Sequence, residues 1–275
     1  MKFRNIFNSP IKIISIVLLS VLSLLIIVDI VILNRKLDEY ISGVSTNIVG
    51  IIITVVFVQL LFNNKIKSDQ KFDEFKKIIR SDKVIQLIMN RYVVFLHCMI
   101  HDHKEINLIQ PSLEIDFKIS SMKFLHDKCF IMKYEFNRTS VSLFYEVELE
   151  LRNIFISMIQ NIDYNFFHEI SNLLLEYINI SYQYDSRGEI LNNENMFAYS
   201  NKNTRVPITK NIKEALENSA EEYMNNLLCG KVNYSNLMFS YVNLYLMINK
   251  QKEILLKYKN YIINIKKEYN KQNVA

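Results

Sequence analysis

Four of the five histidines in this chain lie between His97 and His126. His97 and His101 are four residues apart, so on a helix their rings share one face, which is the arrangement of paired zinc ligands. His103, His126 and Cys129 are further candidate ligands in the same region. The spacing therefore raises the hypothesis of a metal site, either structural or hydrolytic.

The same histidines have a simpler explanation. No glutamate stands beside a candidate ligand as in H-E-x-x-H, and Cys98 points away from the face shared by His97 and His101 on a helix. Histidines near the C-terminal end of a helix are stabilised by the helix dipole without any metal. Both interpretations remain open at the level of sequence.

Other catalytic signatures are missing from the sequence. It contains no glycine-rich phosphate loop, no G-x-S-x-G, no H-E-x-x-H and no paired-cysteine zinc pattern. Only four glycines occur in 275 residues, which leaves little room for tight turns around a nucleotide. We therefore expect a protein that is not an enzyme, has no cofactor and has no small-molecule substrate.

The elements that organise the chain are two apolar segments near its start, Ile13–Leu33 and Ile48–Phe62. A bilayer core requires about 20 mainly apolar residues per helix, so we predict spans over about 11–33 and 45–62. A cleaved signal peptide is disfavoured, because the first run is longer than a typical apolar core of a signal peptide and no small-residue cleavage site follows it. The prediction is a two-helix transmembrane hairpin.

Basic residues flank this predicted hairpin on one side of the membrane. Lys2, Arg4 and Lys12 precede the first span and six Lys or Arg residues between 65 and 80 follow the second, whereas the connecting loop holds only Arg35 and Lys36. The positive-inside rule then places both termini in the cytoplasm. The three cysteines, well separated in sequence, fit a reducing compartment and show no disulfide framework.

The remainder of the chain is predicted to be helical, since four glycines and three prolines are too few for a turn-rich β fold. The fold class is thus all-α: a transmembrane hairpin (1–62), a helical stalk (63–80) and a cytosolic antiparallel helical domain (81–275). Ser81-Asp82 either caps a new helix or lies inside one long bent helix. Strict alternation over 113–119 predicts a minor β insertion around 113–136, and 182–207 is predicted as the longest loop. Apolar periodicity predicts helices over 84–103, 140–161, 163–181, 209–228 and 234–270.

Polar and small residues within the spans are candidates for a pore or for assembly. Asp29 is ionisable within a membrane segment, and Gln59 lies near the inner end of the second span. Gly50 and Thr54 are four residues apart, a spacing of small residues that permits close helix packing. Alternatively, Asp29 is an interfacial carboxylate and the small residues serve only the hairpin itself.

The last predicted helix carries a lysine-rich half with interleaved tyrosines. Its candidate partner-binding residues are Lys257, Lys259, Lys266 and Lys267. Basic and aromatic side chains together suit nucleic acid or anionic headgroups. A solvated face of an amphipathic helix is the alternative explanation.

The stretch Ser45–Phe57, with its Asn, Gly and Thr followed by a lysine-rich stalk, resembles a loose group of bacterial inner-membrane proteins with two spans and a variable cytosolic helical domain. Several of these are effectors of anti-phage systems of the retron and cyclic-nucleotide-signalling types. The resemblance implies that a trigger acts on the cytosolic domain and that the spans then permeabilise the lipid bilayer. We also expect a homo-oligomer, because two helices alone cannot enclose a conduit, and a cytosolic protein or nucleic acid as the trigger. The other hypotheses are a membrane-anchored binding or scaffold module with a passive tether, and a metal-dependent enzyme.

Overall fold

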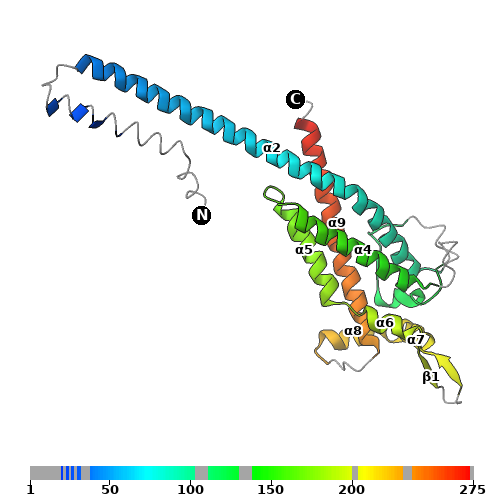
Figure 1. Ribbon diagram of the computed structural model, residues 1–275. Coiled ribbons are helices and arrows are strands. Elements are labelled where there is room, and N and C mark those ends of the chain that lie inside the picture. Colours follow the sequence, from blue (N-terminus) through cyan, green and yellow to red (C-terminus); the bar gives the residue numbers. More distant parts are fainter. Residues whose placement is uncertain are drawn as a thin grey trace. The chain divides into compact units, whose positions relative to one another are not determined.

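The computed structural model describes residues 20, 23–24, 26–27, 30–31, 38–102, 111–129, 138–199, 204–231 and 237–272 (Figure 1). Within them the protein is mostly helical with one small antiparallel sheet, which confirms the predicted helical fold class. The chain divides into two compact units, Met1–Asp73 and Glu74–Ala275. In chain order the elements are α2 (Asp38–Ile100), the 3₁₀ helix η2 (Ile119–Phe124), α4 (Ser140–Asn161), α5 (His168–Gln183), α6 (Arg187–Asn193), β1 (Phe197–Tyr199), β2 (Arg205–Pro207), α7 (Ile208–Asn218), α8 (Ala220–Leu228) and α9 (Met238–Gln272).

The longest element is α2, a single helix of 63 residues. Of the two alternatives at Ser81-Asp82, the structure has the uninterrupted helix, because Asp82 is buried among partners and does not cap a helix start. The helix also begins at Asp38, seven residues before the start predicted for the second span. No proline lies within it, so nothing in the sequence interrupts its backbone hydrogen bonding.

The second unit is built from the last part of α2 and from α4, α5 and α9. α5 packs against both α4 and α9. Phe155 of α4 contacts Tyr177 of α5 with ring centroids 4.9 Å apart, and it contacts Tyr258 of α9 at 6.0 Å. The short connection from α4 to α5 makes these two helices antiparallel neighbours, as predicted for this part of the chain.

That connection contains a backbone conformation that the sequence does not predict. Tyr164 has a φ of 48°, in the left-handed region that non-glycine residues rarely adopt. The two following amides, of Asn165 and Phe166, donate to the carboxylate of Glu74 at 3.2 and 3.1 Å. A carboxylate from α2 therefore fixes the turn between α4 and α5.

Three local predictions were wrong. Residues 113–118 form no strand and lead into η2, while 130–136 lie outside the described residues. The β structure lies instead in the segment predicted as a loop, where β1 pairs with β2 and α6 precedes them. The helix predicted over 209–228 begins one residue earlier, at Ile208, and is divided at Ser219 into α7 and α8.

Candidate membrane segment and buried polar contacts

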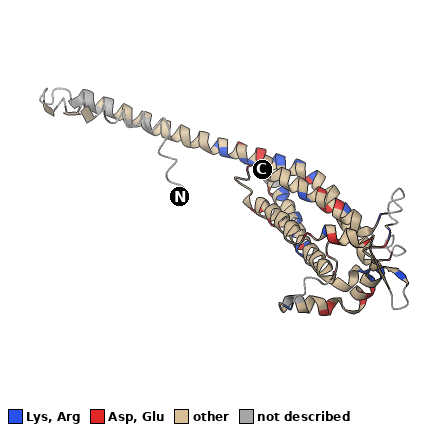
Figure 2. Cartoon of the chain, turned by 60° about the horizontal axis from the view of Figure 1, so that its bottom comes forward, with Lys and Arg blue, Asp and Glu red and all other residues tan. Residues whose placement is uncertain are grey.

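The N-terminal part of α2 is the only helix in the described part of the chain that is long and apolar enough to cross a membrane. From Tyr40 to Asn64 it contains no charged residue. In Figure 2 the tan part of this stretch carries no blue or red. At 1.5 Å per residue this run covers about 37 Å, enough for a bilayer core. The earlier start of the helix thus supplies the length that the predicted span of 45–62 lacked.

Apolar side chains of this run are exposed over most of the helix surface. Val56, Phe57 and Val58 are consecutive, as are Leu60, Leu61 and Phe62, and all six are exposed. Consecutive residues point about 100° apart around a helix, so these two triplets cover about two thirds of its circumference. The remaining face carries the buried Ile48 and the half-buried Val55 and Gln59. Removing such a surface from water is favourable, with a free energy of roughly 25 cal/mol for each Å² of apolar area. By length and composition this segment is a candidate membrane span.

The predicted assembly residues of this segment lie on α2, except Asp29, which is outside the described residues. A Cβ added at Gly50 would meet nothing within 4 Å, so the position is an open notch on the helix surface. The Thr54 hydroxyl donates to the Gly50 carbonyl at 2.8 Å and is thereby satisfied within its own helix. Gln59 is half-buried. Most of the first predicted span likewise lies outside the described residues.

The candidate metal ligands are not brought together as a group of three or more among the described residues. The rings of His97 and His101 stack with centroids 5.5 Å apart, and His97 Nε2 lies 3.1 Å from the amide nitrogen of Ser112. His126 belongs to a different cluster, where its Nε2 contacts the Tyr241 hydroxyl at 2.8 Å. His103 lies outside the described residues.

The cysteines of this region face each other instead of a histidine. The sulfur atoms of Cys98 and Cys129 are 3.6 Å apart and both side chains are buried. The neighbouring Cys129 thiol and burial together raise the pKa of Cys98. A thiol that stays protonated is a poor metal ligand and a poor nucleophile.

The four candidate lysines of α9 differ in their surroundings. Lys257, Lys259 and Lys267 are exposed. Lys266 is half-buried, and its Nζ lies 2.7 Å from Oδ2 of the buried Asp82. Lys266 thus contributes to packing within the second unit, and the other three lysines form the solvent-facing part of this set.

Asp82 is the centre of a polar contact between α2 and α9 that sequence reasoning missed as a functional element. Its Oδ1 accepts hydrogen bonds from Gln86 at 3.0 Å and from the Tyr258 hydroxyl at 3.3 Å. Burial, with the Asp82 carboxylate next to it, raises the pKa of Tyr258. Seven residues before Asp82, Phe75 stacks on Tyr269 with centroids 3.7 Å apart. We call this set of contacts, from Glu74 to Gln86 on α2 and from Tyr258 to Tyr269 on α9, the α2–α9 seam.

A second buried polar cluster joins five helices, α2, α4, α5, α6 and α9, around Glu148. The Tyr92 hydroxyl donates to Gln251 Oε1 at 2.9 Å, and Gln251 Nε2 donates to Glu148 Oε1 at 3.2 Å and to the Ser181 hydroxyl at 2.9 Å. Arg187 pairs with the other carboxylate oxygen at 2.8 Å. Tyr92, Glu148 and Gln251 are almost fully buried, so the cluster fixes the register of the helices and does not face a solute.

One sequence signal points to both clusters: a charged or amide residue on the apolar stripe of a helix. Asp82 lies between Ile78 and Ile85, and Gln251 lies between Ile248 and Leu255. Buried polar groups of this kind require partners, so each predicts a contact with another helix. The sequence does not say which helix supplies it.

The comparisons with known proteins found no relative of this chain. The function is therefore inferred from the residues and contacts above. No family model matches this chain, and no curated protein or solved structure matches it significantly.

Proposed function

We propose that this protein is a bacterial inner-membrane effector whose helical unit binds a partner and whose membrane segments assemble to disrupt the bilayer, in anti-phage defence. The observation that carries the proposal is the largely exposed, uncharged run of α2 within a helix that continues unbroken to Ile100. The assignment to defence rests on the resemblance of Ser45–Phe57 to two-span effectors. In this proposal both predicted spans cross the membrane and both termini are cytoplasmic.

One position of the membrane segment, Gly50, favours assembly of several copies over passive anchoring. Gly50 is an open notch at a depth where another helix of the same sequence can approach closely. Because the Thr54 hydroxyl is satisfied by the Gly50 carbonyl, this surface requires no polar partner and can pack by shape alone. A leucine at position 50 fills the notch without changing the hydrophobicity needed for insertion.

The last part of α2 supplies a route by which a partner can act on the membrane segment. It is held in the second unit by the α2–α9 seam, where Asp82 binds Lys266, and by Glu74, which caps the α4–α5 turn. A partner that alters these contacts changes how the last part of α2 is held to α9 and to the α4–α5 turn. Substitutions in the seam therefore mimic a trigger.

The test is inducible expression in bacteria with a voltage-sensitive dye. We expect depolarisation on expression of an Asp82→Asn variant, or of the wild type with its trigger, and its loss when Gly50→Leu is added. Val56→Arg, which places a charge near the centre of the span at a cost of about 3 kcal/mol, should abolish membrane insertion and depolarisation together. The matched control is Leu87→Arg, an exposed leucine of α2 outside the uncharged run.

A hairpin replacement separates this proposal from a passive tether. Residues 1–62 are exchanged for an unrelated two-span anchor, and growth and membrane potential are measured. Retained activity would show that the spans only anchor a binding module. Membrane potential that persists in every variant, with the native trigger present, would end the effector proposal.

A further inference from the structure

The β1–β2 hairpin presents two aromatic side chains that the helical core does not use. Phe197 and Tyr199 are 46% and 77% exposed. They are two residues apart on one strand and therefore lie on the same face, with about 7 Å between their positions. The alternate residues Ala198 and Val206, which pair with each other, are half-buried, so the aromatic face is the more exposed face of the hairpin. The aromatic face is thus available to a partner.

Basic residues accompany these aromatic rings. Arg205 lies opposite Tyr199 in the strand register, and its guanidinium carbon is 3.9 Å from the centroid of the Phe197 ring. Stacking on Phe197 holds the planar guanidinium at the aromatic face, where its free edges can bind a phosphate. From Asn195 to Lys213 the sequence has four basic residues, Lys202, Arg205, Lys210 and Lys213, and no acidic one.

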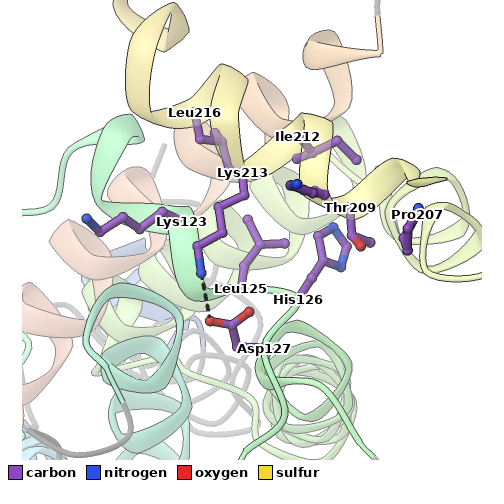
Figure 3. Close-up of a pocket in the computed structure, with 10 residues that line it drawn as sticks. Lys123, Leu125, His126, Asp127, Pro207, Thr209, Ile212, Lys213 and Leu216 are labelled. Carbon is purple, nitrogen blue, oxygen red and sulfur yellow. Dashed lines mark hydrogen bonds and ion pairs between the residues drawn. The ribbon is translucent and has the colours of Figure 1, made fainter. Parts of the chain in front are cut away.

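A cationic pocket adjoins the base of the hairpin, starting at Pro207, which ends β2. It has a volume of about 250 Å³ and includes Lys123, Lys210, Lys213 and Thr209 in its lining (Figure 3). Lys213 pairs with Asp127 at 3.1 Å, and Lys123 pairs with Glu217 at 3.4 Å. Both are exposed ion pairs, which contribute little, so a phosphate group can compete for these lysines.

His126 lines this pocket, but its ring nitrogens are not available to bind an anion. Its Nε2 contacts the Tyr241 hydroxyl at 2.8 Å and its Nδ1 contacts Glu194 at 3.3 Å. Both ring nitrogens are therefore occupied, and the ring forms a wall of the pocket. The cationic and hydroxyl groups on this surface are the lysines, Thr209 and Arg205, and Asp127 is the acidic residue among those that line the pocket.

We propose that the β1–β2 hairpin and the adjoining lysine pocket bind single-stranded nucleic acid. Phe197 and Tyr199 stack against two bases of an extended strand, while Arg205, Lys210 and Lys213 bind its phosphates. A duplex does not fit this surface equally, because its base faces are already stacked on one another. A second copy of the chain is disfavoured as the occupant, because the segment 195–213 would meet its own positive charge. Binding here does not depend on whether α2 crosses a membrane.

The experiment is fluorescence anisotropy with the full-length protein in detergent and a labelled oligonucleotide of about 12 nucleotides, a length within the usual site size of such proteins. Single-stranded DNA, single-stranded RNA and the corresponding duplexes are separate arms. We expect a single-stranded arm to bind more tightly than its duplex. The double variant Phe197→Ala with Tyr199→Ala should weaken single-strand binding by about tenfold or more.

The basic residues are tested by salt dependence. Replacing Arg205 or Lys210 by glutamine should reduce the slope of log K against log salt by about 0.7 for each phosphate that the variant no longer binds. The matched aromatic control is Tyr182→Ala, 62% exposed on α5. The matched charge control replaces Lys257, Lys259 and Lys267 of α9 by glutamine, and circular dichroism of each variant monitors folding.

Three results would overturn the proposal. The wild type fails to bind any single strand, or the α9 lysine variant loses binding while the hairpin variants retain it. In the third, the hairpin variants change the oligomeric mass measured by light scattering and leave oligonucleotide binding unaltered, which would identify the aromatic face as a contact between copies. Because the hairpin residues are exposed, Tyr199→Ala alone serves as a second variant that folds if the double variant does not.

Discussion

Lys266 Nζ lies 2.7 Å from Asp82 Oδ2, and this ion pair joins α9 to the last part of α2. The carboxylate is almost fully buried, whereas the lysine side chain is 42% exposed. Breaking the pair leaves a buried charge with only the hydrogen bonds from Tyr258 and Gln86. The pair is therefore more important for the attachment of α9 to α2 than an ordinary surface ion pair would be.

Replacing Lys266 by methionine should lower the free energy of unfolding by about 2 kcal/mol, the usual contribution of a hydrogen bond to a charged group. Thermal unfolding of the full chain in detergent measures this change. Lys267→Met is the matched control, because Lys267 is exposed on the same turn of α9. Equal melting temperatures for the two variants would contradict the importance of the pair.

The Tyr92–Gln251 hydrogen bond should show energetic coupling. Tyr92→Phe leaves Gln251 Oε1 buried without its donor and should cost about 1–3 kcal/mol. Gln251→Leu removes the contacts with Tyr92, Glu148 and Ser181, and is expected to cost more. A double-mutant cycle should then give a coupling energy of about 1 kcal/mol. Strictly additive losses would show that the two side chains do not interact.

The protein should lose stability as the pH rises above about 10, the ordinary pKa of tyrosine. Burial raises the pKa of Tyr92, Tyr145, Tyr164, Tyr177, Tyr241 and Tyr258. Above that pH the unfolded chain releases phenolic protons that the folded protein retains, so ionisation favours unfolding. The stabilisation is complete below the unfolded pKa. Melting temperature measured against pH, with tyrosinate absorbance recorded in parallel, tests this. A flat profile would contradict it.

A second loss of stability is expected on the acid side. Burial lowers the pKa of His97 below its ordinary value of 6.5, and the charges of His101 and Lys252 act in the same direction. The unfolded chain then takes up a proton before the folded one does, so stability is present above about pH 6.5 and falls as the pH drops below it. His97→Gln should flatten this fall in melting temperature, whereas the exposed His168→Gln should not.

Thiol labelling should distinguish the three cysteines. Cys229 is exposed, while Cys98 and Cys129 are buried against each other, and the pKa of Cys98 is raised. Since the thiolate is the reactive form, iodoacetamide should modify Cys229 in the folded protein and the other two only after denaturation. Mass spectrometry counts the adducts. Modification of all three in the folded state would show that the buried pair is accessible.

Sequence patterns predicted the long helices well, because apolar periodicity depends on residues close together in the chain. The predicted helix 140–161 has the same bounds as α4. The β1–β2 hairpin was missed because its strands have only three residues each and show no extended alternation. The break at Ser219 was missed because no glycine or proline marks it.

The polar contacts that organise the second unit were beyond sequence reasoning for a different reason. Tyr92 and Gln251 are 159 residues apart, and Asp82 and Tyr258 are 176 residues apart. Such pairings depend on how whole helices are placed. The same holds for Cys98 and Cys129, which are separated in sequence and in contact in the fold. The basic and aromatic residues of 195–213 are visible in the sequence, but only the strand pairing brings them onto one surface.

The Glu74 carboxylate that caps the α4–α5 turn has a practical consequence for protein production. A fragment prepared by trimming the candidate membrane segment must retain Glu74, because without it the amides of Asn165 and Phe166 lose their acceptor beside the left-handed Tyr164. Starting one residue later would also place Phe75, the stacking partner of Tyr269, at a frayed end. The best starting point is therefore at or shortly before Asp73, where one compact unit ends and the next begins.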